Sequence, residues 1–326
     1  MNETDDEAAR QPIGGRIKGS GKALAAAGVF LFAAVWLVAK WGTAGEPEKR
    51  GSARKSSAAA GGSSRPAKKP AVPALELNVP VLVPGLEEID PAYGPSLTHD
   101  LTVLVFAGAG KKRGDYDLFI AKRTDPASSF SKPSRMDACS SGRYETFPTL
   151  SPGGLELLFL RFEAQPKLYY ARRDTLDETF GKPEPWAVAE SLPPGRRPGA
   201  AQFIDETHVQ FVTHGKTASE DRQLLLTDRK TQRSKFGEPA PLEFTQAPVP
   251  QFVASDRLRS YFGLPNGLLV AARDSEAEPF EMPTRISDIP ADGPVWVVPK
   301  EGVIFFCSPG FGGQVETSRK LWMLRF

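Results

Sequence analysis

The sequence predicts an all-β fold: a β-propeller of five four-stranded blades, closed by an N-terminal strand and preceded by one transmembrane helix. Three observations lead to this prediction. A short apolar pattern recurs five times along the chain, a Phe-x-x-Pro motif follows it at a constant distance, and an uncharged apolar run stands near the N-terminus. Glycine and proline, 30 residues each among 326, are typical of a chain with many turns.

The composition narrows the function before any motif is considered. Lys and Arg number 41 and Asp and Glu number 39, so the net charge of +2 creates no field that would attract nucleic acid. Two cysteines are too few for a disulfide framework or a thiolate metal site, and three histidines leave little for a zinc centre. We therefore expect no bound metal, no cofactor and no nucleic-acid partner.

The first predicted element is a transmembrane helix over residues 23–41. No side chain is charged from Ala23 to Ala39, a length at the lower limit for a membrane span. Lys22 and Lys40 flank this run, and lysine side chains can reach the headgroups on either side. We therefore expect a single-pass helix that attaches the rest of the chain to a membrane.

A cleaved signal peptide is the alternative for this segment, because Gly42 and Ala44 form a small-x-small pattern after it. The basic residues on its two sides are nearly equal in number, but those before it crowd the apolar run more closely. Residues 1–22 are therefore predicted to be a cytoplasmic tail, with the large domain outside the cytoplasm. Both interpretations export that domain, as an anchored or as a secreted protein.

Residues 42–73 are predicted to be a linker. They are rich in Ala, Ser, Gly and Pro, contain seven basic residues and offer nothing that could form a core. A solvated spacer is the simpler interpretation, and a basic segment that contacts anionic headgroups or cell-wall polymer is the alternative. The remaining residues, 74–326, are predicted to form the propeller.

Repeats predict the architecture of this last part. The apolar pattern begins with leucine in every copy, and the spacings between these leucines are 50, 56, 44 and 53 residues. Phe-x-x-Pro begins twelve residues after the leucine in four copies. The leucines are Leu118, Leu168, Leu224, Leu268 and Leu321, and the phenylalanines are Phe130, Phe180, Phe236 and Phe280. Each unit holds four short strand candidates separated by turn signals, and this period matches one propeller blade.

The closing strand is predicted from what the fifth unit lacks. That unit stops at Phe326, before a fourth strand of its own could form. A degenerate copy of the missing motif, Leu77–Pro80, precedes the first unit. We therefore expect a strand near Pro80–Val83 to complete the blade that holds Leu321. Such closure leaves no open strand edge.

Phe147-Pro148-Thr149-Leu150-Ser151-Pro152-Gly153-Gly154 and Asp117-Leu118-Phe119 resemble the repeats of TolB-type, WD-like propellers. The resemblance extends over residues 77–326. The chain departs from the repeat pattern where Gly153 replaces an aspartate and where lysine replaces aspartate before two of the repeat leucines. The resemblance implies a propeller fold and a noncatalytic binding or scaffold role in a bacterial envelope.

No motif in the sequence specifies catalysis. Gly-x-Ser-x-Gly, His-Glu-x-x-His and phosphate-binding loops do not occur. Acidic residues do recur between the first two strands of the units, as a glycosidase on a five-bladed propeller would require. They are Asp100, Glu156, Asp205, Asp256 and Glu301. Because acidic side chains also cap tight turns, we interpret these residues as turn-forming and predict no catalytic residue.

The candidates for metal and redox chemistry are interpreted as structural. His208 and His214 stand at the two ends of one predicted strand, too far apart to share a metal without a bend. His99 has no partner in the sequence. Cys139 and Cys307 are expected to remain separate thiols.

Loop lengths predict the recognition surface. The third-to-fourth connections are constant, whereas the second-to-third connections vary. In a propeller the second-to-third and fourth-to-first connections share one face, and loops on a rigid frame often carry binding sites. We call this the loop face. Its candidate binding residues are Lys111, Lys112, Arg113, Asp115, Arg143, Arg196, Arg197, Arg319 and Lys320.

Two hypotheses for the function follow. The first is a membrane-anchored, noncatalytic propeller that acts as a binding or scaffold module for a protein or an envelope polymer. The second is an exported glycan-active enzyme, which would need carboxylates clustered in a deep pocket on the propeller axis. The side chains that line the central channel distinguish the two.

Overall fold

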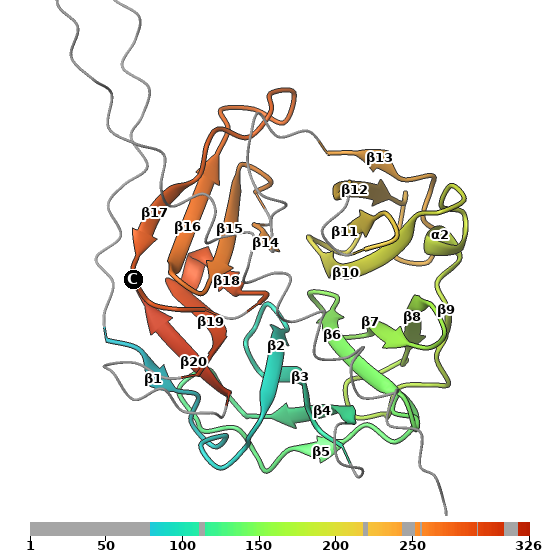
Figure 1. Cartoon of the computed structure of the whole chain (residues 1–326). Coiled ribbons are helices and arrows are strands. Elements are labelled where there is room, and N and C mark those ends of the chain that lie inside the picture. The colour runs from blue at the N-terminus through green and yellow to red at the C-terminus, as the bar shows by residue number, and fades with distance from the viewer. Residues whose placement is uncertain are drawn as a thin grey trace, which may run out of the picture. The chain divides into compact units, whose positions relative to one another are not determined.

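The computed structural model describes residues 79–110, 115–217, 221–242, 252–254, 256–291, 293–309 and 319–326. In this part of the chain the strands form five four-stranded sheets, which Figure 1 shows arranged around a common centre. The predicted five-bladed β-propeller is therefore confirmed. The predicted tail, transmembrane helix and linker lie outside the described residues. Among the residues that are described, no helix has the length and apolar character needed to cross a membrane.

Four blades follow one another along the chain, each starting with its innermost strand. Blade 1 contains β2 (Ala92–Leu97), β3 (Val103–Ala109), β4 (Tyr116–Lys122) and β5 (Ser134–Arg135). Blade 2 contains β6 (Tyr144–Leu150), β7 (Glu156–Phe162), β8 (Pro166–Arg172) and β9 (Glu184–Pro185), followed by the short helix α2 (Ala187–Glu190). Blade 3 contains β10 (Arg197–Phe203), β11 (His208–His214), β12 (Gln223–Asp228) and β13 (Ala240–Pro241). Blade 4 contains β14 (Phe252–Val253), β15 (Arg259–Leu264), β16 (Gly267–Ala272) and β17 (Thr284–Ser287).

The fifth blade joins the two ends of the described chain. It contains β18 (Trp296–Val298), β19 (Val303–Ser308), β20 (Lys320–Arg325) and, as its outermost strand, β1 (Val81–Leu82). Leu82 of β1 lies opposite Trp322 of β20 in an antiparallel pair. The predicted closing strand at Pro80–Val83 is therefore confirmed, and each of the five blades has four strands.

The second strand of each blade contributes buried apolar residues to the core. In β3 and in β19, six consecutive residues are buried. These strands pack against neighbouring blades on both faces, so their sequences are continuous apolar runs rather than alternating ones. Each second strand contributes a fully buried phenylalanine: Phe106, Phe159, Phe211, Phe262 and Phe305.

The recurring arginine and phenylalanine of the repeats contact each other. In blade 1 the Arg123 guanidinium lies 4.3 Å from the centre of the Phe130 ring, and its Nε donates to the Leu101 carbonyl at 2.7 Å. We call this contact the arginine clamp. It explains the constant spacing of the motif, because the chain must return from the third strand to place the ring under the guanidinium. The clamp recurs at Arg173 and Phe180, Arg229 and Phe236, and Arg273 and Phe280, at 4.5, 4.3 and 4.5 Å.

A β-bulge interrupts the innermost strands of the first three blades. The register of each strand with its neighbour shifts within β2, β6 and β10. Gly94 and Phe147 lie at these bulges with positive φ values of 55° and 49°. Pro95 and Pro148 follow them, and proline is tolerated there because a bulge leaves its nitrogen outside the hydrogen-bond ladder. The bulge residues Gly94, Pro95, Phe147 and Pro148 line one pocket.

Candidate functional site

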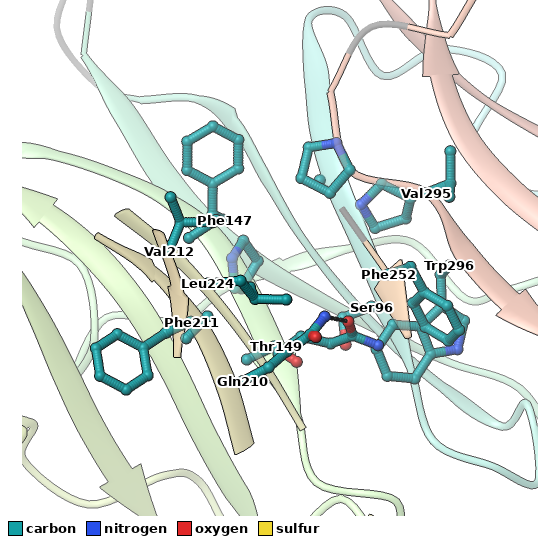
Figure 2. Close-up of a pocket in the computed structure, with 17 residues that line it drawn as sticks. Ser96, Phe147, Thr149, Gln210, Phe211, Val212, Leu224, Phe252, Val295 and Trp296 are labelled. Atoms are coloured by element: carbon teal, nitrogen blue, oxygen red, sulfur yellow. Dashed lines mark hydrogen bonds between the residues drawn. The ribbon is translucent and has the colours of Figure 1, made fainter. Parts of the chain in front are cut away.

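Five side chains occupy the same position on the innermost strands of the five blades. They are Ser96, Thr149, Gln202, Phe252 and Trp296, each opposite the corresponding residue of the second strand. We call them the channel ring. All five are buried, and all five line one pocket (Figure 2). Blades 1 to 3 supply the polar members of the ring, and blades 4 and 5 supply the aromatic ones.

The polar members of the channel ring connect neighbouring blades. The N–H of Leu150 in blade 2 donates to Ser96 Oγ in blade 1 at 2.9 Å. In the same way the N–H of Phe203 in blade 3 donates to Thr149 Oγ1 in blade 2 at 3.2 Å. A third bond of this kind joins blade 3 to blade 4 through Gln202. Because these bonds are buried, they fix the ring members rigidly relative to one another.

The pocket around the channel ring is lined by uncharged side chains. We call it the channel pocket, and its cavity volume is about 30 Å³, enough for only one or a few water molecules. Phe147, Ala200 and Pro294 are partly exposed and form its rim, with the buried channel ring beneath them. The other lining residues are Gly94, Pro95, Pro148, Ala201, Gln210, Phe211, Val212, Leu224 and Val295. The axial carboxylates that a glycosidase would need are not among the residues lining this pocket.

Buried carboxylates in the first two blades are held by arginines of their own blade. Arg135 in β5 donates two hydrogen bonds to Asp117 in β4, at 2.6 and 2.9 Å. Arg161 in β7 donates to Glu145 in β6 at 2.8 Å. Asp117 and Glu145 are both fully buried, so their charges are compensated inside the blades and are not presented to a substrate.

Glu156 forms a buried ion pair across a blade boundary. It begins β7 in blade 2, and Arg229 of blade 3 donates to it through both terminal nitrogens, with Nη1 at 2.8 Å. The Tyr170 hydroxyl also donates to this carboxylate. Burial disfavours the charge of Arg229, but the hydrogen bonds and negative charge of Glu156 outweigh it and raise the pKa of the guanidinium. Burial, together with the same carboxylate, raises the pKa of Tyr170.

Three of the five acidic residues predicted to form turns do so, whereas the carboxylate of Glu156 is bound by Arg229 and Tyr170 instead. Oδ1 of Asp100, Asp205 and Asp256 each accepts the backbone N–H two residues further along, at 3.0, 2.7 and 2.9 Å. For Asp100 and Asp205, burial opposes the charge, but the hydrogen bonds from neighbouring side chains and backbone outweigh it and lower the pKa of the carboxyl. Glu301 lies in the 3₁₀ turn η1 (Pro299–Glu301).

His208 and His214 are held by local contacts, and both cysteines are buried. His208 Nδ1 lies 2.8 Å from the carboxylate that caps its own turn, and His214 Nδ1 at the far end of β11 lies 2.9 Å from a backbone carbonyl. Cys139 and Cys307 are separate buried thiols, as predicted, and burial raises the pKa of Cys139 to about 12. Within the described ranges, no three His, Cys, Asp or Glu side chains are placed to hold a metal ion.

Six of the nine predicted binding residues are described, and they lie on the loop face. They lie at, or just before, the first residues of β4, β6, β10 and β20, and they are Asp115, Arg143, Arg196, Arg197, Arg319 and Lys320. Lys111, Lys112 and Arg113 lie outside the described residues. The six do not form one cluster: Arg196 pairs with Asp221 in blade 3 at 2.8 Å, whereas Lys320 Nζ donates to the Glu87 carbonyl at 3.0 Å.

A row of aromatic side chains on the loop face was not predicted from the sequence. Tyr93, Tyr116, Tyr144 and Phe162 contact one another in that order, with ring centres 5.2, 4.7 and 5.4 Å apart. We call these four residues the aromatic row. The Arg319 guanidinium lies 5.0 Å from the centre of the Tyr93 ring, so one predicted binding residue joins this row. Tyrosine at the first or second position of three strands was the sequence signal that could have revealed it.

The aromatic row is partly exposed and uncharged. Its side chains extend from the starts of β2, β4 and β6 to the end of β7, which places them across blades 1 and 2. Burial raises the pKa of Tyr116 and of Tyr144, so both phenols remain neutral. The row therefore offers apolar ring surface with hydroxyl groups beside one stacked cation.

Comparisons with known proteins find distant similarities only. No family model and no curated protein matches the chain. TolB from Acinetobacter baumannii has 13% sequence identity and a TM-score of 0.43, over 72% of this chain and 54% of that one. A putative TolB from Agrobacterium tumefaciens has 15% identity and a TM-score of 0.34, over 48% of this chain and 51% of that one. The matches thus span about half the length of these two TolB chains.

The solved structures similar to this chain also include an enzyme. The catalytic domain of a GH62 alpha-L-arabinofuranosidase from Coprinopsis cinerea has 12% identity and a TM-score of 0.40, over 75% of this chain and 95% of that one. With identities and TM-scores this low, the function has to be argued from the residues of the site.

Proposed function

We propose that this chain is a membrane-anchored, noncatalytic propeller that binds a protein partner through its loop face. The aromatic row with Arg319 is the observation that carries the proposal. Tyr, Phe and Arg are enriched at the centres of protein interfaces, where they supply large contact areas at low conformational cost. Four blade strands fix the row, so little order has to be gained when a partner binds.

The arrangement of the carboxylates supports a noncatalytic role. Glycoside hydrolysis needs two carboxyl groups on opposite sides of one bond, and one of them must exchange a proton. Asp117, Glu145 and Glu156 are engaged by arginines, and Asp100, Asp205 and Asp256 are engaged by turn amides. The channel pocket itself offers amides, hydroxyls and aromatic rings. No specific observation in the described residues favours the glycan-active alternative.

The location outside the cytoplasm belongs to the same proposal. It rests on the uncharged run from Ala23 to Ala39, the basic residues crowded before it and the linker at residues 42–73. A linker of this composition lets the propeller reach a partner at some distance from the membrane. Secretion after signal cleavage remains the alternative location.

A photo-crosslinking experiment tests the proposed binding face. A benzophenone amino acid replaces Tyr144 in the aromatic row, and the matched control places it at Asp177, an exposed position on the opposite face. We expect protein adducts from position 144 and none from position 177. Adducts that resist protease and carry polysaccharide would identify an envelope polymer instead, and equal adducts at both positions would refute the loop face.

Substitutions then separate binding from catalysis. Tyr144→Ala should weaken binding of the crosslinked partner about tenfold, the loss typical of a central interface residue. Charge reversal of the loop-face candidates Lys111, Lys112 and Arg113 should also weaken binding. Asp205→Asn and Asp256→Asn should leave binding intact. Hydrolysis of a glycan panel by the purified protein, abolished by either amide substitution, would establish the enzyme instead.

A further inference from the structure

The rings of the aromatic row are tilted relative to one another and do not form a flat platform. Neighbouring rings meet at interplanar angles of 59°, 48° and 89°. A sugar ring stacks flat on an aromatic face, so a run of sugars needs several faces in one plane. Tilted rings present edges as well as faces. They suit a ligand whose own small rings project in turn from a backbone, as the rings of proline do.

The spacing of the rings matches a polyproline II helix. Neighbouring ring centres are 5.2, 4.7 and 5.4 Å apart. Alternate rings are therefore at most about 10 Å apart, and one turn of a polyproline II helix, three residues of about 3.1 Å each, advances about 9 Å. Every third residue of such a helix lies on the same side, so prolines at every third position would meet alternate rings.

The hydroxyl groups of the row suit the backbone of such a helix. A polyproline II helix makes no internal hydrogen bonds, so its carbonyl groups can accept hydrogen bonds from a binding partner. Burial raises the pKa of Tyr116 and of Tyr144, so both phenols keep the hydrogen that they would donate. Proline has no N–H that the row would have to satisfy, and its preset backbone loses little entropy on binding.

The charges beside the row favour a ligand that carries carboxylates. Four acidic residues adjoin members of the row in the sequence, and all are engaged within the protein: Asp115, Asp117, Glu145 and Glu163. Arg143 directly precedes Tyr144 and is exposed, and within the described ranges its guanidinium has no ion-pair partner. Arg319 stacks on Tyr93 at the first end of the row. An acidic residue of the ligand would therefore meet a cation beside the rings.

The linker of this chain also contains prolines, but it does not fit the row. Residues 42–73 carry seven basic residues and two acidic ones, so the linker has the same sign of charge as Arg143 and Arg319. The direction of β1 also argues against the linker. Val83, directly after β1, donates its N–H to the Leu321 carbonyl near the start of β20, so β1 runs toward the loop face and the preceding chain arrives from the opposite face. The occupant therefore belongs to a partner.

We propose that the aromatic row binds a proline-rich segment of a partner protein, held as a polyproline II helix, with acidic residues beside its prolines. Proline rings contact the aromatic rings, backbone carbonyls accept from the tyrosine hydroxyls, and a carboxylate pairs with Arg143. This proposal rests on the proposed function, because it takes the partner to be a protein, and it specifies which part of that protein is recognised.

Fluorescence anisotropy with the full-length chain in lipid nanodiscs tests the proposal. The probe is a dye-labelled peptide of three Pro-Pro-Ala repeats with two glutamates at each end. One control peptide has glycine in place of every proline, and the other has lysine in place of every glutamate. We expect the probe to bind at least about tenfold more tightly than either control. An unlabelled chitin tetrasaccharide should not displace it.

Substitutions locate the binding site of the probe. Tyr116→Ala should weaken binding about tenfold, and Tyr116→Phe, which keeps the ring, should weaken it less. Arg143→Gln should reduce the preference for the glutamate peptide over the lysine peptide. Arg172→Gln is the matched control, because Arg172 is exposed at the end of β8 on the opposite face, and it should bind the probe as the wild type does.

Equal binding of the probe and the glycine peptide, equal loss in Arg172→Gln, or displacement by the tetrasaccharide would overturn the proposal. If Tyr116→Ala does not fold, the choice of the wild type between the proline and glycine peptides decides. Protein adducts from the photo-crosslinker at position 144, without binding of the probe, would keep the protein-binding function and overturn only the proline-rich partner. Neither adducts nor probe binding would overturn both.

Discussion

The side chain of Arg229 makes two structural contacts. Its guanidinium lies over Phe236 within blade 3 and pairs with Glu156 of blade 2. The side chains of the pair are only 2% and 1% exposed, so neither charge is solvated if the other is removed. This pair makes the boundary between the two blades dependent on charge as well as on apolar packing.

Glu156→Gln should lower the free energy of unfolding by about 3 kcal/mol, because it leaves the Arg229 charge buried without an opposite charge. Urea unfolding followed by circular dichroism measures this loss. Asp288→Asn is the matched control, since it disrupts an ion pair with Arg285 whose side chains are 88% and 46% exposed. The control should change stability by less than about 0.5 kcal/mol. Equal effects of the two substitutions would contradict the importance of the buried pair.

His214 should make the stability of the propeller depend on pH. The residue is buried, and burial lowers the pKa of His214 from its ordinary value of 6.5, with the positive charges of Arg222 and Arg197 acting in the same direction. The unfolded chain therefore binds more protons just below pH 6.5, so the free energy of unfolding decreases as the pH falls through that window. His214→Gln should reduce this dependence on pH. Urea midpoints measured above and below pH 6.5 test the prediction, and an unchanged dependence would count against this role.

Residues that act locally could be predicted, and residues that act between blades could not. The turns at Asp100, Asp205 and Asp256 depend on amides two residues away, so sequence position was sufficient. Glu156 and Arg229 are 73 residues apart, and their meeting depends on which strands face each other across a blade boundary. Spacing within a repeat carries no information on that packing, which is also why the channel pocket was not foreseen.

At the scale of single elements, the repeat predicted the order of the strands but not the contact that maintains it. The leucine-to-phenylalanine spacing located the third and fourth strands correctly. In the arginine clamp, the arginine that follows the third strand lies over this phenylalanine. The sequence did not predict that contact, because it depends on how the chain folds back between the third and fourth strands. The aromatic row was missed for a related reason, because its members come from four strands in two blades.

The closing strand β1 has few paired residues, but the segment after it is deeply packed. Val83 is fully buried and Leu86 is 3% exposed, both within the core of blades 1 and 5. Removing residues 1–73 should leave the stability of the propeller unchanged. Removing residues 1–88 should lower it by at least about 3 kcal/mol, because these two side chains lose their burial and β20 becomes an open edge.

Thermal unfolding of the two truncated proteins measures the difference, and equal stability would contradict closure by β1. A point substitution tests the same segment in the intact chain. Gly85 has a φ of +90°, and a Cβ there would lie 2.2 Å from the Phe130 carbonyl oxygen. Gly85→Val should therefore destabilise the protein in the same direction as the longer truncation.

At the scale of the whole molecule, the proposed arrangement places the propeller outside the cytoplasm. Ser57→Cys introduces a thiol in the linker, and a membrane-impermeant maleimide should label it in intact cells whose inner membrane is sealed. Cys139 and Cys307 are fully buried in the folded propeller, so their background labelling should be low. Labelling only after the inner membrane is permeabilised would show that the orientation is reversed.

The fold of the whole propeller could be predicted from the sequence because the number of repeat motifs shows how many strands each blade has. Five repeat leucines and four Phe-x-x-Pro motifs left one strand missing, and the only degenerate copy stood at the other end. The number of repeats does not predict which face of the propeller binds a partner. It depends on side chains that gather from different blades, as the aromatic row and Arg319 do.

The pairing of β1 with β20 also determines how the propeller would respond to mechanical load. A pull on the linker enters through Val81 and Leu82 and through the Val83 N–H, which donates to the Leu321 carbonyl at 3.0 Å. This junction contains far fewer bonds than the six-residue register between β19 and β20. It would yield first, releasing the tether from blade 5 while blades 1 to 4 keep all of their strands. The strand that closes the ring is thus also the first strand expected to detach under mechanical load.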